Sequence, residues 1–276
     1  MAFLHTHSCE CIKSELDLFK TRPTQTSIES SHWIDYKPIT SLSDDSPIEF
    51  VIPGNGEEYL DLSHTILILK VCLVDSKGEK IKDEALVVPV NNFLHSIFNQ
   101  VDVFFNQTLV SPPNNSYAYR AFIETLLNYS EEAKMSHLTS SLWYDDLPDF
   151  VDTHLEKEVD PHDGTAITLN AGAEKRREYI KGGKSVDMLG HLHCDVFNQD
   201  KFLLNGIEVR VRLVRSKSAF CLVNHEADDT KVRIQEATLR VRRAKINPGI
   251  LLAHSKALPR GTAKYELTRV EVKSFT

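Results

Sequence analysis

The amino-terminal stretch holds the residues whose types and spacing most resemble a metal site. Four potential ligands stand at alternate positions: His5, His7, Cys9 and Cys11. An extended chain projects alternate side chains from one side, and imidazole and thiolate groups are the usual zinc ligands. Strictly alternate ligands strain to wrap one tetrahedral ion, because zinc sites usually place two or more residues between cysteines. Two interpretations follow: structural zinc, or a flexible arm with incidental thiols, which we favour.

A second local group consists of His191, His193 and Cys194. In the strand pattern of this region the two histidines share a face and Cys194 points away, so we favour core or sheet-surface residues over metal ligands. The chain has no nucleophile elbow, P-loop, dinucleotide fingerprint or HExxH motif. Ser, His and Asp are plentiful, but no spacing selects a catalytic triad. We therefore expect no enzyme and no small-molecule substrate.

Basic residues are concentrated on two predicted strands: Arg210, Arg212, Arg215, Lys217, Arg233, Arg240, Arg242, Arg243 and Lys245. One hypothesis is a face that touches DNA through a salt-sensitive, sequence-independent attraction. The interpretation that we favour is a solvated or intersubunit face whose arginines pair with carboxylates. A further basic run at 175–177 is interpreted as a solvated loop.

Composition narrows the class of protein. The 276 residues are 41% hydrophobic, with a formal net charge of -7, which argues against a chain built as a whole to coat nucleic acid. No apolar run approaches the roughly 18 residues that span a bilayer, and residues 1–11 lack the pattern of a secretion signal. Five scattered cysteines do not form a disulfide framework. We expect an intracellular protein of the cytoplasm or nucleus, without a membrane partner.

The elements that would position these residues begin after an extended amino-terminal arm, predicted at 1–45 because the segment is polar and aperiodic. Strands are predicted at 48–52 and 59–75, followed by a short helix at 93–98. A hairpin is expected with its tip at Asn106 and Gln107. An apolar helical repeat predicts a helix over 117–127 that Asn115 or Ser116 can cap.

The second half of the chain is predicted to continue the sheets. A polar stretch of about 130–185, with several Pro and Gly residues, is expected to be a surface insertion. Strands follow at 185–197, 202–214 and 232–245, and the apolar parity flips between Ile234 and Ala237, which predicts a β-bulge. Asn247 caps a helix with Pro248 at its first position. The tail from Ala263 is predicted to be one more strand.

This order of elements favours an all-β fold, a β-sandwich with a few short helices in its connections. The final strand has no partner in the chain, and an exposed edge is a liability, so we expect a truncated second unit. The alternative from another class is a single jelly-roll binding module that recognises carbohydrate or protein. A cupin-type enzyme is weaker, because no cluster with two-His and carboxylate spacing is visible.

Five internal strings resemble the major capsid protein of Polinton (Maverick) elements, virus-like DNA transposons of eukaryotes. They are PVNNFLHSIFNQVDV, YRAFIETLLNY, SHLTS, FLLNGIEVRVRLVRSK and NPGILLAHSKALPRGTAK. The amino-terminal HTHSCECIKSELDLF and PTQTSI look like the start of the same family. The resemblance covers nearly the whole chain.

The resemblance implies the first jelly roll of a double jelly-roll capsid protein. It implies a jelly roll at 46–246, a linker helix at 247–260 and the first strand of a truncated second roll at 261–276. It also implies homotrimers that look pseudo-hexagonal in an icosahedral shell, next to neighbouring capsomers and a penton-type protein. The expected location is the virion, with non-specific contact to packaged DNA as a possible addition.

Overall fold

The computed structural model describes residues 16, 18–19, 21, 24–43, 46–54, 56–112, 115–147, 157–159, 166–168, 170–224 and 230–273. The predicted zinc ligands at 5–11 lie outside these residues.

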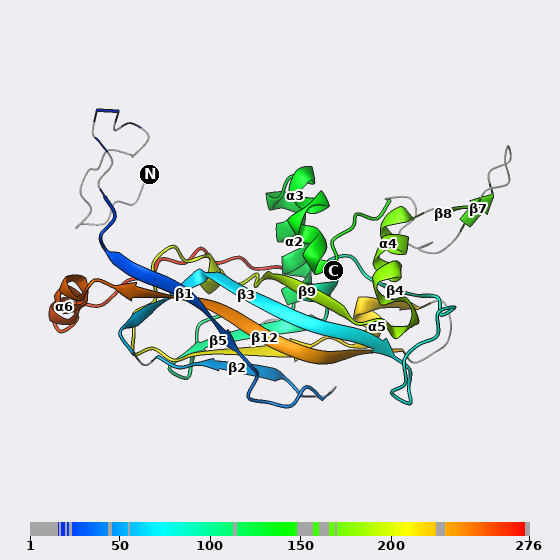
Figure 1. Cartoon of the computed structure of the whole chain (residues 1–276), viewed down its shortest axis with the longest axis horizontal. Coiled ribbons are helices and arrows are strands. Elements are labelled where there is room, and N and C mark those ends of the chain that lie inside the picture. The colour runs from blue at the N-terminus through cyan, green and yellow to red at the C-terminus, as the bar shows by residue number, and fades with distance from the viewer. Residues whose placement is uncertain are drawn as a thin grey trace.

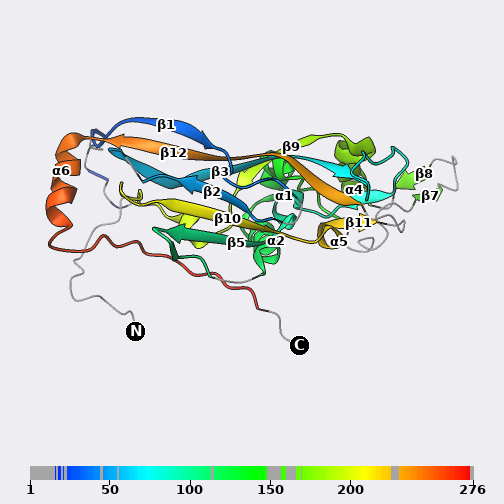
Figure 2. The ribbon, with the colours of Figure 1, turned by 90° about the horizontal axis from the view of Figure 1, so that it is seen from below.

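Two stacked antiparallel sheets form the body in the described part of the chain (Figures 1 and 2). The first sheet has the order β1-β12-β3-β9 and consists of β1 (Ile28–Tyr36), β12 (Lys231–Ile246), β3 (Glu58–Val74) and β9 (Val186–His191). The second has the order β2-β10-β5-β6 and consists of β2 (Ile48–Ile52), β10 (Val209–Arg215), β5 (Phe98–Phe105) and β6 (Thr108–Leu109). The predicted β-sandwich is confirmed.

The hydrophobic core lies between the two sheets. On β2 and on the first five residues of β10, fully buried side chains alternate with half-buried ones, as expected for a strand with one face against the core. Phe50, Leu69 and Val211 are all completely buried and belong to one continuous apolar cluster. Burial of this apolar area is the main term that stabilises the sandwich.

The predicted irregularity in β12 is present. The pairing of β12 with β3 shifts between Ile234 and Glu236, where two exposed residues interrupt the alternation. The bulge returns Ala237 to the core face, as the flip of apolar parity requires. A second shift follows between Arg240 and Arg242.

Part of the segment that we predicted as an arm belongs to a sheet. β1 pairs antiparallel with β12, with Trp33 opposite Arg242 and Tyr36 opposite Leu239. Most of its side chains are exposed, so the strand is held by backbone hydrogen bonds at the sheet edge and carries little apolar alternation. The prediction of an arm is therefore wrong for 28–36.

The predicted hairpin forms between β5 and β6. Asn106 and Gln107 at its tip have φ values of 45° and 69°, the left-handed conformation that a tight two-residue turn needs. The expected short helix is α1 (Phe93–Ser96). A small sheet of β4 (Val87–Pro89) and β11 (Leu222–Asn224) lies beside it, next to the short helix α5 (Ser218–Cys221).

The predicted surface insertion contains short helices and strands, and some of its other side chains are buried. They are α3 (Glu131–Met135), η2 (His137–Ser141), β7 (Lys157–Val159), β8 (Ala166–Thr168), α4 (Ala171–Ile180) and η4 (Lys181–Gly183). Trp143 is 1% exposed and Arg176 is completely buried. Arg176 donates to the Pro89 carbonyl oxygen at 2.8 Å and pairs with Asp146. The interpretation of 175–177 as a solvated loop is wrong, because the middle residue of that run joins the insertion to β4.

The helix that follows β12 begins with the predicted cap at Asn247. In α6 (Pro248–Ala257) the Asn247 side chain accepts a hydrogen bond from the Gly249 backbone at 2.9 Å. Residues 262–273 form no strand; they run back from α6 along the body towards α2 (Figure 2). This differs from the strand that the sequence predicts, because a strand needs a neighbour and none of the described strands pairs with the tail.

Candidate functional site

A buried polar network lies beneath α2 (Tyr117–Asn128). Arg120 and Glu124 are one helical turn apart and point into the protein, with side chains 6% and 15% exposed. Their partners lie on the turn after β9 and on η5 (Asp195–Asn198). The network thus joins a helix to a segment about 70 residues away in the sequence.

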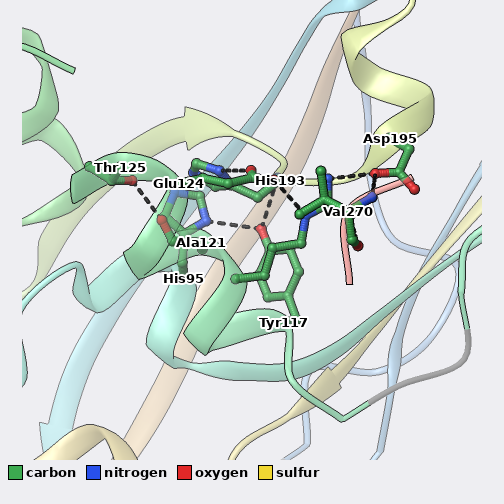
Figure 3. Close-up of polar contacts among 9 residues, drawn as sticks. His95, Tyr117, Ala121, Glu124, Thr125, His193, Asp195 and Val270 are labelled. Atoms are coloured by element: carbon green, nitrogen blue, oxygen red, sulfur yellow. Dashed lines mark hydrogen bonds and ion pairs between the residues drawn. The ribbon is translucent and has the colours of Figure 1, made fainter. Parts of the chain in front are cut away.

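Arg120 is the centre of the network, and Figure 3 labels its partners Glu124, Asp195 and Val270. Its Nε lies 2.7 Å from Glu124 Oε1, and its Nη2 lies 2.6 Å from Asp195 Oδ1. Asp195 also accepts a 3.3 Å hydrogen bond from the Val270 backbone, and Arg120 donates to the Val270 carbonyl oxygen at 3.4 Å. One guanidinium therefore joins two carboxylates and the tail, a geometry that its planar array of donors allows.

Two histidines extend the network towards α1. His193 Nδ1 lies 2.8 Å from Glu124 Oε2, and His95 Nδ1 lies 3.0 Å from the Tyr117 hydroxyl. The two imidazole rings meet edge to face with centroids 4.7 Å apart. The Tyr117 hydroxyl also accepts a hydrogen bond from the His193 backbone at 3.4 Å.

Burial controls the ionisation of these groups. Burial lowers the pKa of His95 well below its usual value, and the neighbouring His193 and His191 lower it further. Burial also raises the pKa of Tyr117 well above its usual value. For Glu124, burial alone would raise the pKa, but hydrogen bonds from His193 and Arg120 outweigh it and the pKa is lowered. The network is therefore a neutral histidine and tyrosine next to a charged arginine–carboxylate group.

This arrangement suits a structural role better than a catalytic one. Each ionised carboxylate is engaged by Arg120 or His193, whereas a general base needs to reach a substrate proton. The nearby Cys194 is a poor nucleophile, because burial raises the pKa of its thiol to about 12. What the network does is fix the orientation of α2 and hold the tail.

The group of His191, His193 and Cys194 was predicted to consist of core or sheet-surface residues. Cys194 is 4% exposed and belongs to the apolar core, while His191 ends β9 with Nδ1 3.1 Å from the Thr65 carbonyl oxygen. Across the residues that the structure describes, no group of three or more His, Cys, Asp or Glu side chains is placed to hold a metal ion. Nor does any helix in the same ranges have the length and apolar content to cross a membrane.

The basic residues on β10 and β12 are divided between the two sheets, and many face carboxylates. Arg240 pairs with Asp35 at 2.6 Å and Arg242 with Asp61 at 3.2 Å. Three more ion pairs join Arg210 to Glu208, Arg212 to Glu49 and Lys245 to Glu29. Arg243 is buried and donates to the Tyr36 hydroxyl and the Pro53 carbonyl oxygen.

Sequence reasoning did not identify the network beneath α2. It treated 117–127 as an apolar helix and gave no role to Arg120, Glu124 or Asp195. One signal was available: Arg120 and Glu124 are the two charged residues of the helix and stand at the i, i+4 spacing of a paired couple. Their partner Asp195 is distant in the sequence, so it could not be found by spacing.

Comparisons with known proteins give one sequence relative and a set of similar solved structures. No protein-family model matches the chain. The uncharacterized protein F54H12.2 of Caenorhabditis elegans is 25% identical over 262 residues, which is 91% of this chain and 58% of that protein. The Faustovirus major capsid protein superposes with a TM-score of 0.53 at 10% identity, over 87% of this chain and 58% of that one. A chain of the Sputnik virophage structure gives 0.51 at 11% identity, over 87% and 53%.

The chain thus spans a little over half the length of each of these proteins. At 10–11% identity the likeness to the solved structures shows the fold. The two stacked antiparallel sheets, the short connecting helices and these superpositions together show that the chain has the jelly-roll fold found in viral capsid proteins.

Proposed function

We propose that this chain is a structural shell subunit: the first jelly roll of a double jelly-roll major capsid protein from a Polinton-like element. The observation that carries the proposal is the superposition on the Faustovirus major capsid protein over 87% of the chain. The five sequence strings that resemble Polinton capsid proteins support the finer assignment. Fold alone does not determine function, so the proposal depends on assembly.

The domain organisation is part of the proposal. The jelly roll occupies 46–246 with β1 added at its edge. The linker is 247–260. Residues 262–273 form no strand in this structure, and the proposal is that the tail at 261–276 becomes the first strand of a second roll when that roll supplies its partner strands. All residues of α6 are at least partly exposed, which supports a helix that connects two units. Sequencing the reading frame beyond Thr276 tests this: a second set of strands supports it, and an immediate stop codon in an intact gene counts against it.

The proposed partners are other copies of the chain in a homotrimer, neighbouring capsomers and a penton-type protein. The assembled location would be the virion, formed in the cytoplasm or nucleus of the host. Contact with packaged DNA is the weaker part of the proposal. The ion pairs of Arg212, Arg240 and Arg242 support the interpretation of a self-neutralised face, because paired arginines attract phosphate less than unpaired ones.

Zinc binding by His5, His7, Cys9 and Cys11 remains the alternative to incidental thiols, and a direct measurement decides between them. Metal content is determined by mass spectrometry for the chain and for a variant without residues 1–12. We expect equal zinc in both. One zinc ion per chain that disappears with the deletion would establish the site.

Assembly tests the proposed function itself. The chain, expressed with whatever coding sequence follows Thr276, is examined by analytical ultracentrifugation and electron microscopy. A species of three times the chain mass and pseudo-hexagonal particles are expected. A well-folded monomer at all concentrations would leave the single jelly-roll binding module as the better description.

One cavity bears on that alternative. A groove of about 680 Å³ next to α6 has apolar walls that include Phe202, Leu204, Ile250 and Leu258. Carbohydrate sites need several converging polar groups, and these walls supply few. The groove therefore does not favour a carbohydrate-binding module.

A further inference from the structure

The outward face of α2 is an apolar stripe. It consists of Tyr119, Phe122, Ile123, Leu126 and Leu127, and each side chain is between 39% and 75% exposed. Their spacing follows the i, i+3, i+4 and i+7 pattern of one helix face. We call these five residues the α2 stripe. Helices α2 and α3 project from the sheets (Figure 1).

The orientation of α2 is the reverse of the usual one for a surface helix. A helix on the surface of a water-soluble protein turns charged residues outward and apolar residues inward. Here the charged residues turn inward, with Arg120 buried and the Glu124 side chain 15% exposed, and the large apolar residues face outward. Burying ions carries a desolvation penalty. The Asp195 and His193 partners offset that penalty and lock the orientation.

The apolar surface continues beyond the helix. Tyr119 stacks edge to face on Phe220 of α5 with centroids 5.5 Å apart, and Phe220 is itself 39% exposed. On the inward side Phe122 packs on the buried Trp143, with ring centroids 5.2 Å apart. A contiguous exposed patch of aromatic and leucine side chains on a folded domain marks an interaction surface, since a solitary protein rarely exposes one.

We propose that the α2 stripe is a contact between copies of this chain, with α2 of one copy packed on α2 of the next. The proposal rests on the shell function above and names one of its interfaces. The stripe has no charge of either sign, so an identical face can approach without burying an unpaired ion. Aromatic and leucine side chains with charges excluded also match the composition of homomeric interface cores.

Cysteine cross-linking tests whether two stripes meet. Leu127→Cys is introduced with Cys9 and Cys11 replaced by Ser; the described natural cysteines, Cys72, Cys194 and Cys221, are buried. Mild oxidation should give chains linked as dimers through the new thiol. The matched control is Leu252→Cys on α6, a leucine that is 55% exposed, and it should remain unlinked. Equal linking at both positions, or none at 127, would overturn the proposal.

Charge insertion measures the contribution of the stripe. Leu127→Arg should lower the association constant in sedimentation equilibrium by at least about tenfold, as expected for a central interface residue. Leu252→Arg should leave it unchanged, and circular dichroism should show both variants folded. If the unmodified chain assembles and Leu127→Arg does too, the α2 proposal fails while the shell proposal stands.

Two other outcomes also count against the α2 contact. If the chain with the coding sequence that follows Thr276 stays monomeric, both proposals fail. If Leu127→Arg instead abolishes binding to phosphatidylcholine vesicles and leaves self-association intact, the stripe is a lipid-binding surface and the α2 contact is overturned.

Discussion

Arg120 and Asp195 form an ion pair 2.6 Å long between α2 and η5, with side chains only 6% and 2% exposed. Glu124 completes the arrangement from the other side of the guanidinium. Removing one member of such a group leaves the others charged and without a partner. We therefore expect the loss of either residue to destabilise the fold strongly. The ion pair holds α2 in an orientation that places its large apolar residues outward.

Removing the central cation should strongly destabilise the fold. Arg120→Met leaves Glu124 and Asp195 without their shared partner, so we expect the free energy of unfolding to fall by about 3 to 5 kcal/mol. Urea denaturation followed by circular dichroism measures the loss. The control is Arg240→Met on the exposed pair with Asp35, which should change stability by a small fraction of that amount. Similar losses for both variants would show that the buried pair contributes no more to the free energy of unfolding than the exposed pair does.

The neutral state of His95 should make the protein sensitive to mild acid. Because burial lowers its pKa below the ordinary value of 6.5, the unfolded chain takes up a proton near that pH and the folded chain does not. Stability is therefore complete above about pH 6.5 and falls as the pH drops, by up to roughly 1.4 kcal/mol per unit from this residue. The lowered pKa values of His191 and Glu124 act in the same direction.

Urea denaturation between about pH 5 and pH 8 checks this dependence. His95→Gln should flatten the slope just below pH 6.5, whatever its effect on overall stability. Trp33→Phe, on the exposed edge strand, removes no ionisable group and should leave the slope unchanged. An unaltered slope in the His95 variant would rule out its burial as the cause.

Arg176 should be as important as a core residue although it lies in a basic run. Its guanidinium donates to the carbonyl oxygens of Pro89 and Tyr144 and pairs with Asp146. Arg176→Met leaves those acceptors without a hydrogen-bond donor. We therefore expect a loss of roughly 2 to 5 kcal/mol in the free energy of unfolding. Glu178→Gln on the exposed side of α4 is the control and should have little effect. A solvated Arg176 would give the same small change as the control.

The buried thiols should be inert in the native protein. Burial raises the pKa of Cys194 and of Cys221 to about 12, so only about one thiol in ten thousand is ionised at pH 8. Alkylation by iodoacetamide, mapped by mass spectrometry in a variant with Cys9 and Cys11 replaced by Ser, should label both cysteines only after unfolding. Rapid labelling of Cys194 in the native chain would show that the helix α2 region opens.

Local features of this fold could be predicted from the sequence. The hairpin at Asn106 and Gln107, the bulge after Ile234 and the cap at Asn247 are all present. Each is specified by a few neighbouring residues: two residues that accept a tight turn, a change in the alternation of apolar residues, or a capping side chain.

Features that depend on distant partners could not be predicted. β1 is polar and exposed, and only its pairing with β12 makes it a strand. The burial of Arg176 depends on acceptors more than 30 residues away in the sequence, on Pro89 and Tyr144. In α2 the apolar periodicity indicates a helix but not which face is buried, because Asp195 and His193 decide that from another segment.

The central claim is that this jelly roll builds a shell through contacts between copies, and the mass of the assembled chain tests it most directly. Sedimentation equilibrium over a wide concentration range, on the chain with any coding sequence that follows Thr276, should show a species of three times the chain mass. A folded protein that remains at the mass of a single chain across the whole range would contradict the claim.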